Sequence, residues 1–224
     1  DGKEHTVQVY VESTPEWAVN TINQPVRSER LTGNGITFLK TGTIEQPVLA
    51  KNGDDIRIDW GYYYLAACDI PSNTMSIGDP AALKTEFIEK GQLGNTFDGS
   101  LPEKMYLGMT ALSYASDLGK VGTKTKTGYL MIGYDDIYSI QYFGNNLLAY
   151  WRNGGAVDIR QALTLAADDY NPIMKRCVAF DKKMLAETGK AGGKKYAELC
   201  ALAYRQSIVA HKLVVTKDGE LLFL

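Results

Sequence analysis

The hydrophobic pattern of this chain changes its period once, and that change limits the fold more than any other feature. Up to Arg152 apolar and polar residues often alternate, as in the segment His5–Glu12, which is typical of half-buried β-strands. From Asp158 onward the apolar residues recur every three or four positions, which is the period of an amphipathic helix. We therefore expect a mainly β protein with α structure: a region of antiparallel β-strands over 1–153, followed by a helical hairpin within 154–224.

Turn-forming residues divide the first region into expected strands. Gly33–Gly35 separates two apolar segments and predicts a hairpin, because glycine readily takes positive φ. Lys51–Asp54 marks another turn, and the following Ile56–Leu65 becomes aromatic throughout, which indicates a central strand covered on both faces. The remaining expectations are a short helix or structured loop over 79–90 with Asp79-Pro80 at its start, strands over 104–113 and 127–134, and a terminal hairpin around Lys217–Glu220.

The helical region carries its own breaks. Asn171-Pro172 interrupts the first helical pattern and predicts either a kink or two helices in sequence. Gly189–Gly193 predicts the turn, and a second helix is expected over 194–213. That second helix is apolar around much of its circumference, so we expect an exposed apolar face that packs on neighbours or mediates self-association.

Composition excludes several classes of function. The 224 residues carry 24 Lys and Arg against 26 Asp and Glu, so the basic excess typical of nucleic-acid binding is missing. No stretch approaches the roughly 20 apolar residues that a membrane-spanning helix needs. The basic, glycine-rich segment 118–126 lacks the phosphate-loop spacing, because Gly119-Lys120 is followed by Val121, and we expect a solvated hairpin loop there.

Cysteine and histidine are too sparse for a structural zinc site, and we expect no metal and no cofactor. A metal site built from carboxylates alone would leave no such mark in the sequence and stays open. The three cysteines are Cys68, Cys177 and Cys200. Cys177 and Cys200 either pair across adjacent helices or are two small buried apolar groups.

Two clusters are candidates for lining a functional pocket. Asp135 and Asp136, with Tyr138, follow a predicted strand and suit acid–base chemistry or the binding of a cation or polar ligand; the alternative is a turn with backbone-bonded aspartates. Arg205 and His211 on the last helix each suit a ligand contact or an interhelical hydrogen bond. Their six-residue spacing places them on opposite faces of an ideal helix, so they do not share a site.

A set of aromatic residues has two interpretations, a buried core or an exposed platform that stacks on sugar rings, and the core interpretation is favoured. Its members are Trp17, Trp60, Tyr62, Tyr63, Tyr64, Tyr138, Tyr142, Tyr150 and Trp151.

The chain begins at Asp1 and ends in the apolar run Glu220–Leu224, from which we expect a fragment of a longer protein. Several ordered strings resemble the glutaminase A family: Asp1–Tyr10, Ser13–Asn20, Ile58–Tyr62, Gly133–Gly144 with Tyr150–Arg152, and Gly193–Gln206 with Ala210–Leu213. The resemblance implies a secreted or periplasmic hydrolase that converts glutamine to glutamate and ammonia. It further implies that this chain covers the later β-sandwich region and the first helical hairpin of a C-terminal (α/α) toroid similar to six-hairpin glycosidases. It assigns no catalytic residue to a position here.

Three functional hypotheses follow. The first is an incomplete piece of a glutaminase-A-like amidohydrolase, inactive alone, whose β region is a scaffold for an intact protein with a small-molecule substrate. The second is a carbohydrate-binding or glycosidase-accessory module, suggested by the aromatic residues. The third is a structural interaction domain that self-associates through the exposed helical face.

Overall fold

The computed structural model describes residues 2–51, 57–94, 102–104 and 110–224. The chain forms two compact units, Asp1–Ile137 and Tyr138–Leu224, and each is described by itself. The domain boundary expected from the sequence, at 153/154, lies further along the chain than the division between these units after Ile137. It stays a prediction.

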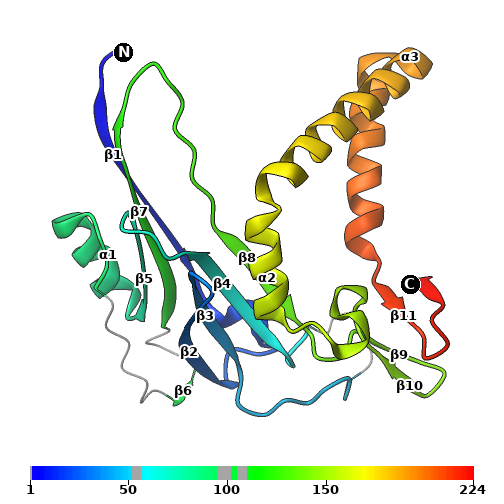
Figure 1. Cartoon of the computed structure of the whole chain (residues 1–224). Coiled ribbons are helices and arrows are strands. Elements are labelled where there is room, and N and C mark those ends of the chain that lie inside the picture. Colours follow the sequence, from blue (N-terminus) through cyan, green and yellow to red (C-terminus); the bar gives the residue numbers. More distant parts are fainter. Residues whose placement is uncertain (1, 52–56, 95–101, 105–109) are drawn as a thin grey trace. The chain divides into compact units, whose positions relative to one another are not determined.

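The described part of the first unit consists of strands with one α-helix and one short 3₁₀ helix (Figure 1). In chain order the elements are β1 (His5–Ser13), η1 (Pro15–Ala18), β2 (Pro25–Gly33), β3 (Ile36–Thr43), β4 (Tyr62–Cys68), β5 (Asn73–Gly78), α1 (Pro80–Lys90), β6 (Pro102–Lys104), β7 (Ala111–Val121) and β8 (Met131–Asp135). Their antiparallel pairs form one sheet with the order β1-β7-β5 and another with the order β6-β2-β3-β4-β8.

The two sheets share one apolar core, which confirms the expected antiparallel sandwich. Leu39 and Leu65 from the β6-β2-β3-β4-β8 sheet join Met75 and Leu112 from the β1-β7-β5 sheet in a single buried cluster. Alternation along β7 sends Leu112 into this cluster, whereas Ala111 turns to a second cluster with Leu83 of α1. Helix α1 therefore packs on the β1-β7-β5 sheet.

Local turn and cap signals were read correctly at several points. The hairpin at Gly33–Gly35 joins β2 to β3, with positive φ at Asn34 (51°) and Gly35 (70°), as a two-residue primed turn requires. Asp79 caps α1 by accepting a hydrogen bond from the amide of Ala82 at 2.8 Å. Strand β4 is interior and buried on both faces, as expected.

Other expectations need correction or lie outside the described residues. Strand β4 begins at Tyr62, so residues 57–61 do not extend the ladder; the buried side chain of Asp59 bonds instead to Gln24 and Lys51, and Ile56 lies outside the described residues. Of the strand expected over 104–113, Lys104 ends β6 and Ala111–Ser113 begin β7, and residues 105–109 lie outside the described residues. The turn at Lys51–Asp54 lies largely within 52–56, outside the described residues.

The segment between β7 and β8 is not the expected hairpin. Strand β7 continues through Leu118 to Val121 and pairs with β1, whereas β8 pairs with β4 in the other sheet. The chain over 122–130 therefore crosses from one sheet to the other. Local periodicity indicated strands that overlap β7 and β8 in part, but for β7 a partner about 100 residues earlier in the chain decides the sheet.

The second unit combines two small hairpins with helices. Its elements are β9 (Ile140–Tyr142), β10 (Asn145–Leu147), η2 (Tyr150–Gly155), α2 (Ile159–Asp168), α3 (Tyr170–Ala210), β11 (Leu213–Val215) and β12 (Leu221–Phe223). Strand β9 pairs with β10, and β11 pairs with β12 around the expected turn at Lys217–Glu220.

The α-helices of this unit are α2 and α3, and α3 itself forms a helical hairpin. A capping box of Asp158 and Gln161 starts α2, which ends before Asp169, so two helices in sequence replace the alternative of a single kinked helix. Gly193, with φ 80° and ψ −176°, breaks α3 into limbs over 170–192 and 194–210. The Phe180 and Tyr204 rings lie 5.2 Å apart, so the limbs lie side by side as the expected helical hairpin.

The two cysteines of the hairpin are free, and Cys177 is exposed, so the prediction that it is buried was wrong. The contact of Phe180 with Tyr204 sets the register of the limbs. With a rise of about 1.5 Å per residue, that register offsets Cys177 from Cys200 by about 10 Å along the helix axis. A disulfide does not fit this arrangement, because it needs Cα atoms within about 7 Å.

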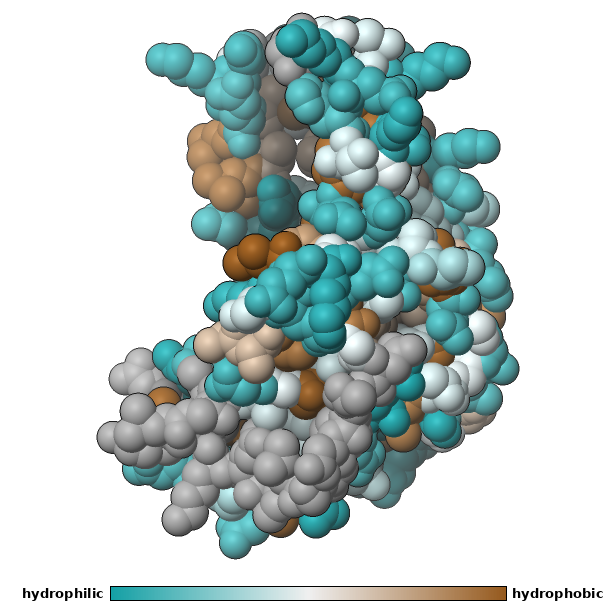
Figure 2. Space-filling view, turned by 90° about the vertical axis from the view of Figure 1, so that its left-hand side faces the viewer, coloured by the Kyte–Doolittle hydropathy of each residue, from teal (hydrophilic) through white to brown (hydrophobic). Residues whose placement is uncertain are grey.

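Several large apolar side chains are exposed on the helical hairpin. Figure 2 shows brown apolar side chains among teal ones over α3, in the upper part of the view. The most exposed are Val178, Leu199, Leu202 and Val209. None of the helices in the described ranges is long and apolar enough to cross a bilayer.

The aromatic residues divide between both interpretations. Trp60, Tyr63 and Tyr64 are buried, as a core requires. Trp17 is 66% exposed, so its indole is accessible for stacking on a ligand. The carbohydrate-binding alternative stays a prediction.

Candidate functional site

Sheet pairing brings two acidic segments together in the first unit. In the antiparallel ladder between β4 and β8, Tyr62 pairs with Asp135. Asp59 lies three residues before Tyr62, and Asp136 follows Asp135 directly, so the start of β4 and the end of β8 bring carboxylates from both strands to one end of the sheet. This end of the β4–β8 pair is the candidate site.

Close backbone contact holds this end of the ladder. Gly61 has φ 82°, a left-handed conformation that favours glycine. A Cβ at this position would overlap the carbonyl oxygen of Asp135 and press on the Cα of Asp136. The side chain of Gln46 bridges to β4 from the other side, accepting from the amide of Gly61 and donating to the carbonyl of Thr43 at 2.7 Å.

Asp59 is the most enclosed carboxylate of the site. It is fully buried, and its Oδ2 accepts from Lys51 Nζ at 2.7 Å and from Gln24 Nε2 at 2.8 Å. Its Oδ1 has no hydrogen-bond partner within the described part of the chain. The Lys51 side chain is 41% exposed, so the ion pair connects a buried anion with a cation that reaches water.

Tyr134 contacts this acidic group from β8. Its hydroxyl donates to the carbonyl of Trp60 at 2.7 Å. Burial raises the pKa of Tyr134 well above its ordinary value of 10, and repulsion from the carboxylates of Asp136, Asp59 and Asp135 raises the pKa further. The tyrosine is therefore protonated at neutral pH and acts as a hydrogen-bond donor.

The predicted pair Asp135 and Asp136 is nearly fully buried, with 7% and 8% exposure. Asp135 Oδ1 accepts from the amide of Ile137 at 3.0 Å, and Ile137 takes a positive φ of 59°. Asp135 thus stabilises a turn, which is the alternative that the sequence left open. Whether Asp135 and Asp136 also act on a ligand stays a prediction.

The other predicted residues lie in the second unit. Tyr138 is 36% exposed, and Arg205 lies on the second limb of α3, where it lines a groove with Phe180 and Asp181. His211 follows the end of α3; its Nδ1 contacts the carbonyl oxygen of Ser207, and its ring stacks on Phe223 with centroids 4.6 Å apart. His211 thus helps to fix the chain between α3 and the terminal hairpin.

Sequence reasoning missed the residues that surround Asp59. Gln24, Gln46 and Lys51 are isolated polar residues in turn-like segments, and their spacing gives no signal of a shared partner. Asp59 itself was read as the polar position of an alternating strand. The one available signal was an acidic residue next to tryptophan, at the start of the aromatic and apolar run 60–65.

The arrangement has limited chemical capacity on its own. Asp59 accepts hydrogen bonds from Lys51 and Gln24, and Asp135 accepts one from the amide of Ile137 in the turn. Within the described ranges, no group of three or more His, Cys, Asp or Glu side chains is placed to hold a metal ion. These contacts fix the positions of the β4 and β8 ends relative to each other.

Comparisons with known proteins identify a family and a distant relative of the chain. The chain belongs to the DUF5127 family, a domain of unknown function, which it matches over residues 1–187. It is also similar to glutaminase A of Aspergillus oryzae (strain ATCC 42149 / RIB 40), with 25% identity over 231 aligned residues. The alignment covers all of this chain and 33% of that relative, so the chain spans about a third of its length. The two proteins are distantly related.

Proposed function

We propose that this chain is part of a glutaminase-A-like amidohydrolase, which hydrolyses the side-chain amide of glutamine with one water to give glutamate and ammonia. The observation that carries the proposal is the alignment of the whole chain with glutaminase A. Because the aligned region runs through both compact units, it supports common descent of the sandwich and of the helical hairpin, not of one short motif.

In this proposal the β-sandwich is a scaffold that borders the active cavity, and the chain alone is inactive. Amide hydrolysis needs an activated nucleophile and a proton donor for the leaving ammonia. Asp59 and Asp135 are held by structural hydrogen bonds, which supports a positioning role for them. The reacting groups are then supplied by the rest of the longer protein, whose helical part would continue the hairpin of α3 into a toroid.

The proposal also covers the location of the protein, its substrate and its self-association. The resemblance to glutaminase A supports a secreted or periplasmic protein with a small-molecule substrate. In the isolated chain, the exposed apolar side chains of α3 favour self-association, because such surfaces are costly to leave in water. Light scattering of the chain over a range of concentrations tests that part, and a monodisperse monomer contradicts it.

The decisive experiment is a coupled ammonia assay with glutamine, run on this chain and on the longest parent polypeptide. The proposal expects ammonia release by the parent only. Activity in the 224-residue chain would refute the scaffold role, and activity in neither protein would refute the glutaminase assignment.

A pair of variants of the parent tests whether the first unit borders the cavity. Asp136→Asn removes a nearly buried charge at the end of β8, and Asp218→Asn removes an exposed charge in the terminal turn. We expect a change in kcat or KM for Asp136→Asn and none for Asp218→Asn. Equal kinetics for both variants would contradict a bordering role of the β8 end.

A further inference from the structure

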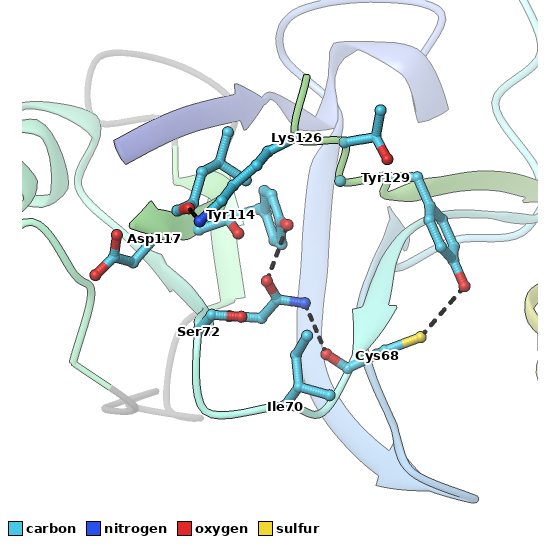
Figure 3. A pocket seen from close by; sticks show the side chains of 12 residues that line it. Cys68, Ile70, Ser72, Tyr114, Asp117, Lys126 and Tyr129 are labelled. Atoms are coloured by element: carbon cyan, nitrogen blue, oxygen red, sulfur yellow. Dashed lines mark hydrogen bonds between the residues drawn. The ribbon is translucent and has the colours of Figure 1, made fainter. Parts of the chain in front are cut away.

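A second cavity lies in the first unit, with no lining residue in common with the Asp59 site. It has a volume of about 500 Å³ and lies where the end of β4, the start of β5 and the crossing segment 122–130 meet β7 (Figure 3). Small-molecule sites typically occupy about 300–1,000 Å³, so the cavity has room for a ligand of one or two six-membered rings. The two sheets of the sandwich both contribute to its wall.

A chain of hydrogen bonds fixes the wall of this cavity. Tyr114 Oη donates to Asn73 Oδ1 at 3.0 Å, and Asn73 Nδ2 donates to the Cys68 carbonyl at 2.9 Å. Cys68 Sγ then lies 3.5 Å from Tyr129 Oη. The dashed lines in Figure 3 follow this chain of hydrogen bonds from Tyr114 at one end to Tyr129 at the other. The chain links β7, β5, β4 and the crossing segment, so the polar groups are held before any ligand arrives.

The wall offers both donors and acceptors to a ligand. The Asn73 side chain uses one amide hydrogen and one lone pair in these bonds, which leaves one of each. Hydroxyl groups of Ser72, Ser116 and Thr127 also line the cavity. A hydroxyl is itself both donor and acceptor, so a ligand with several hydroxyl groups can pair with both kinds of group in this wall.

The charges of the cavity argue against an ionic ligand. One carboxylate, Asp117, and one ammonium, Lys126, are among the lining residues. Lys126 Nζ donates to the carbonyl of Leu118 at 2.8 Å, and Asp117 Oδ1 accepts from the amide of Gly119 at 2.7 Å. Both charged groups already have hydrogen-bond partners, and their opposite charges leave the wall with no net charge. A phosphate or an organic cation needs an excess of the opposite charge.

We propose that this cavity binds a small neutral polyhydroxylated molecule, a monosaccharide, disaccharide or polyol, through Asn73, Tyr129 and the hydroxyl groups of its wall, with the half-buried Tyr129 ring beside the carbon face of the ligand. The proposal does not depend on the glutaminase assignment. It also differs from stacking on Trp17, which lines another cavity with Val11 and Ile132.

Cys68 gives a direct measure of occupancy. The wild-type chain is treated with iodoacetamide in the presence of glucose, galactose, N-acetylglucosamine, maltose or sorbitol, and the alkylation of each cysteine is followed by mass spectrometry. At least one compound is expected to slow alkylation of Cys68 about tenfold at saturation. Cys177 and Cys200, which lie in the second unit, serve as internal controls and are expected to react at an unchanged rate.

Variants test whether the wall makes the contacts. Tyr129→Phe removes one hydroxyl, and Thr127→Val replaces an exposed hydroxyl with a methyl group of similar size. Each is expected to weaken binding by saturation-transfer NMR roughly three- to tenfold, since one hydrogen bond contributes about 0.5–1.5 kcal/mol. Tyr142→Phe, in the second unit, is the matched control and is expected to bind like the wild type.

The outcomes separate the proposal from its competitors. Protection of Cys68 by sugars but not by sorbitol assigns a ring-shaped ligand, and protection by both assigns polyols in general. No protection by any of these compounds overturns the proposal. Quenching of indole fluorescence without protection of Cys68 also overturns it, because that result places the ligand at a tryptophan and none of the tryptophans lines this cavity. Inorganic phosphate and lysine are tested in parallel, and protection of Cys68 by either of these alone overturns the neutral-ligand assignment.

Discussion

Replacing Gly61 with alanine is expected to destabilise the first unit. The loss should exceed that caused by the same substitution at a glycine of similar φ whose surroundings are open. Two effects add at this position. Holding an L-residue at φ 82° costs about 1–2 kcal/mol. The added Cβ also overlaps the carbonyl oxygen of Asp135, and this backbone atom cannot rotate away as a flexible side chain would. Overpacking of this kind costs about 1–3 kcal/mol, so the expected total is about 2–5 kcal/mol.

Gly35→Ala is the matched control for this prediction. Gly35 has φ 70° in the turn between β2 and β3, and nothing lies within 4 Å of its added Cβ. It therefore carries only the conformational cost of about 1–2 kcal/mol. The difference between the two variants measures the contact of the β4 and β8 ends.

Urea unfolding, followed by tryptophan fluorescence, measures both free energies of unfolding, and Trp60 next to the substituted residue is a local reporter. Gly61→Ala is expected to lose at least 1 kcal/mol more than Gly35→Ala. Equal losses within 0.5 kcal/mol would refute the reasoning, because they would mean that the two strand ends separate at no cost.

Three further predictions concern the same unit. Lys51→Met is expected to lower the free energy of unfolding by about 2 kcal/mol, because buried Asp59 loses its cation; a loss below 0.5 kcal/mol in urea titrations would contradict the pairing. The raised pKa of Tyr134 means that the stability it contributes is present below pH 10 and is lost as the pH rises above it. The free energy of unfolding of the wild type should therefore fall between pH 10 and 11.5, and fall less steeply in Tyr134→Phe, with equal slopes counting against the assignment. Asp79→Ala removes the acceptor for the amide of Ala82 and should cost about 1 kcal/mol in thermal unfolding followed by circular dichroism; a loss no larger than that of Asp218→Ala, in an exposed turn, would contradict the cap.

Local signals in the sequence were sufficient for much of the fold. Gly33–Gly35 and Lys217–Glu220 encode their turns within four residues, and Asp79 caps its helix through an amide three residues away. Gly193 breaks α3 inside the predicted turn. In each case the interacting groups are neighbours in the chain, so spacing alone predicts them.

Pairings across long separations were not predictable in the same way. The segment 118–126 was interpreted as a hairpin loop because strands lie on both sides of it, but β7 pairs with β1, far back in the chain. Likewise, Asp59 bonds to Gln24, which is 35 residues away, and no period or spacing relates the two. Asp135 and Asp136 were found because two adjacent acids at the end of a strand are visible by themselves.

The pairing of β1 with β7 has a consequence for how the protein is made. His5 pairs with Val121, so the first strand leaves the ribosome more than 100 residues before its partner is synthesised. At about 5–20 residues per second, β1 waits on the order of 5–20 s as an unpaired strand. During that interval its exposed edge is open to wrong partners, and a chaperone that binds extended segments would find its target in the first residues of this chain.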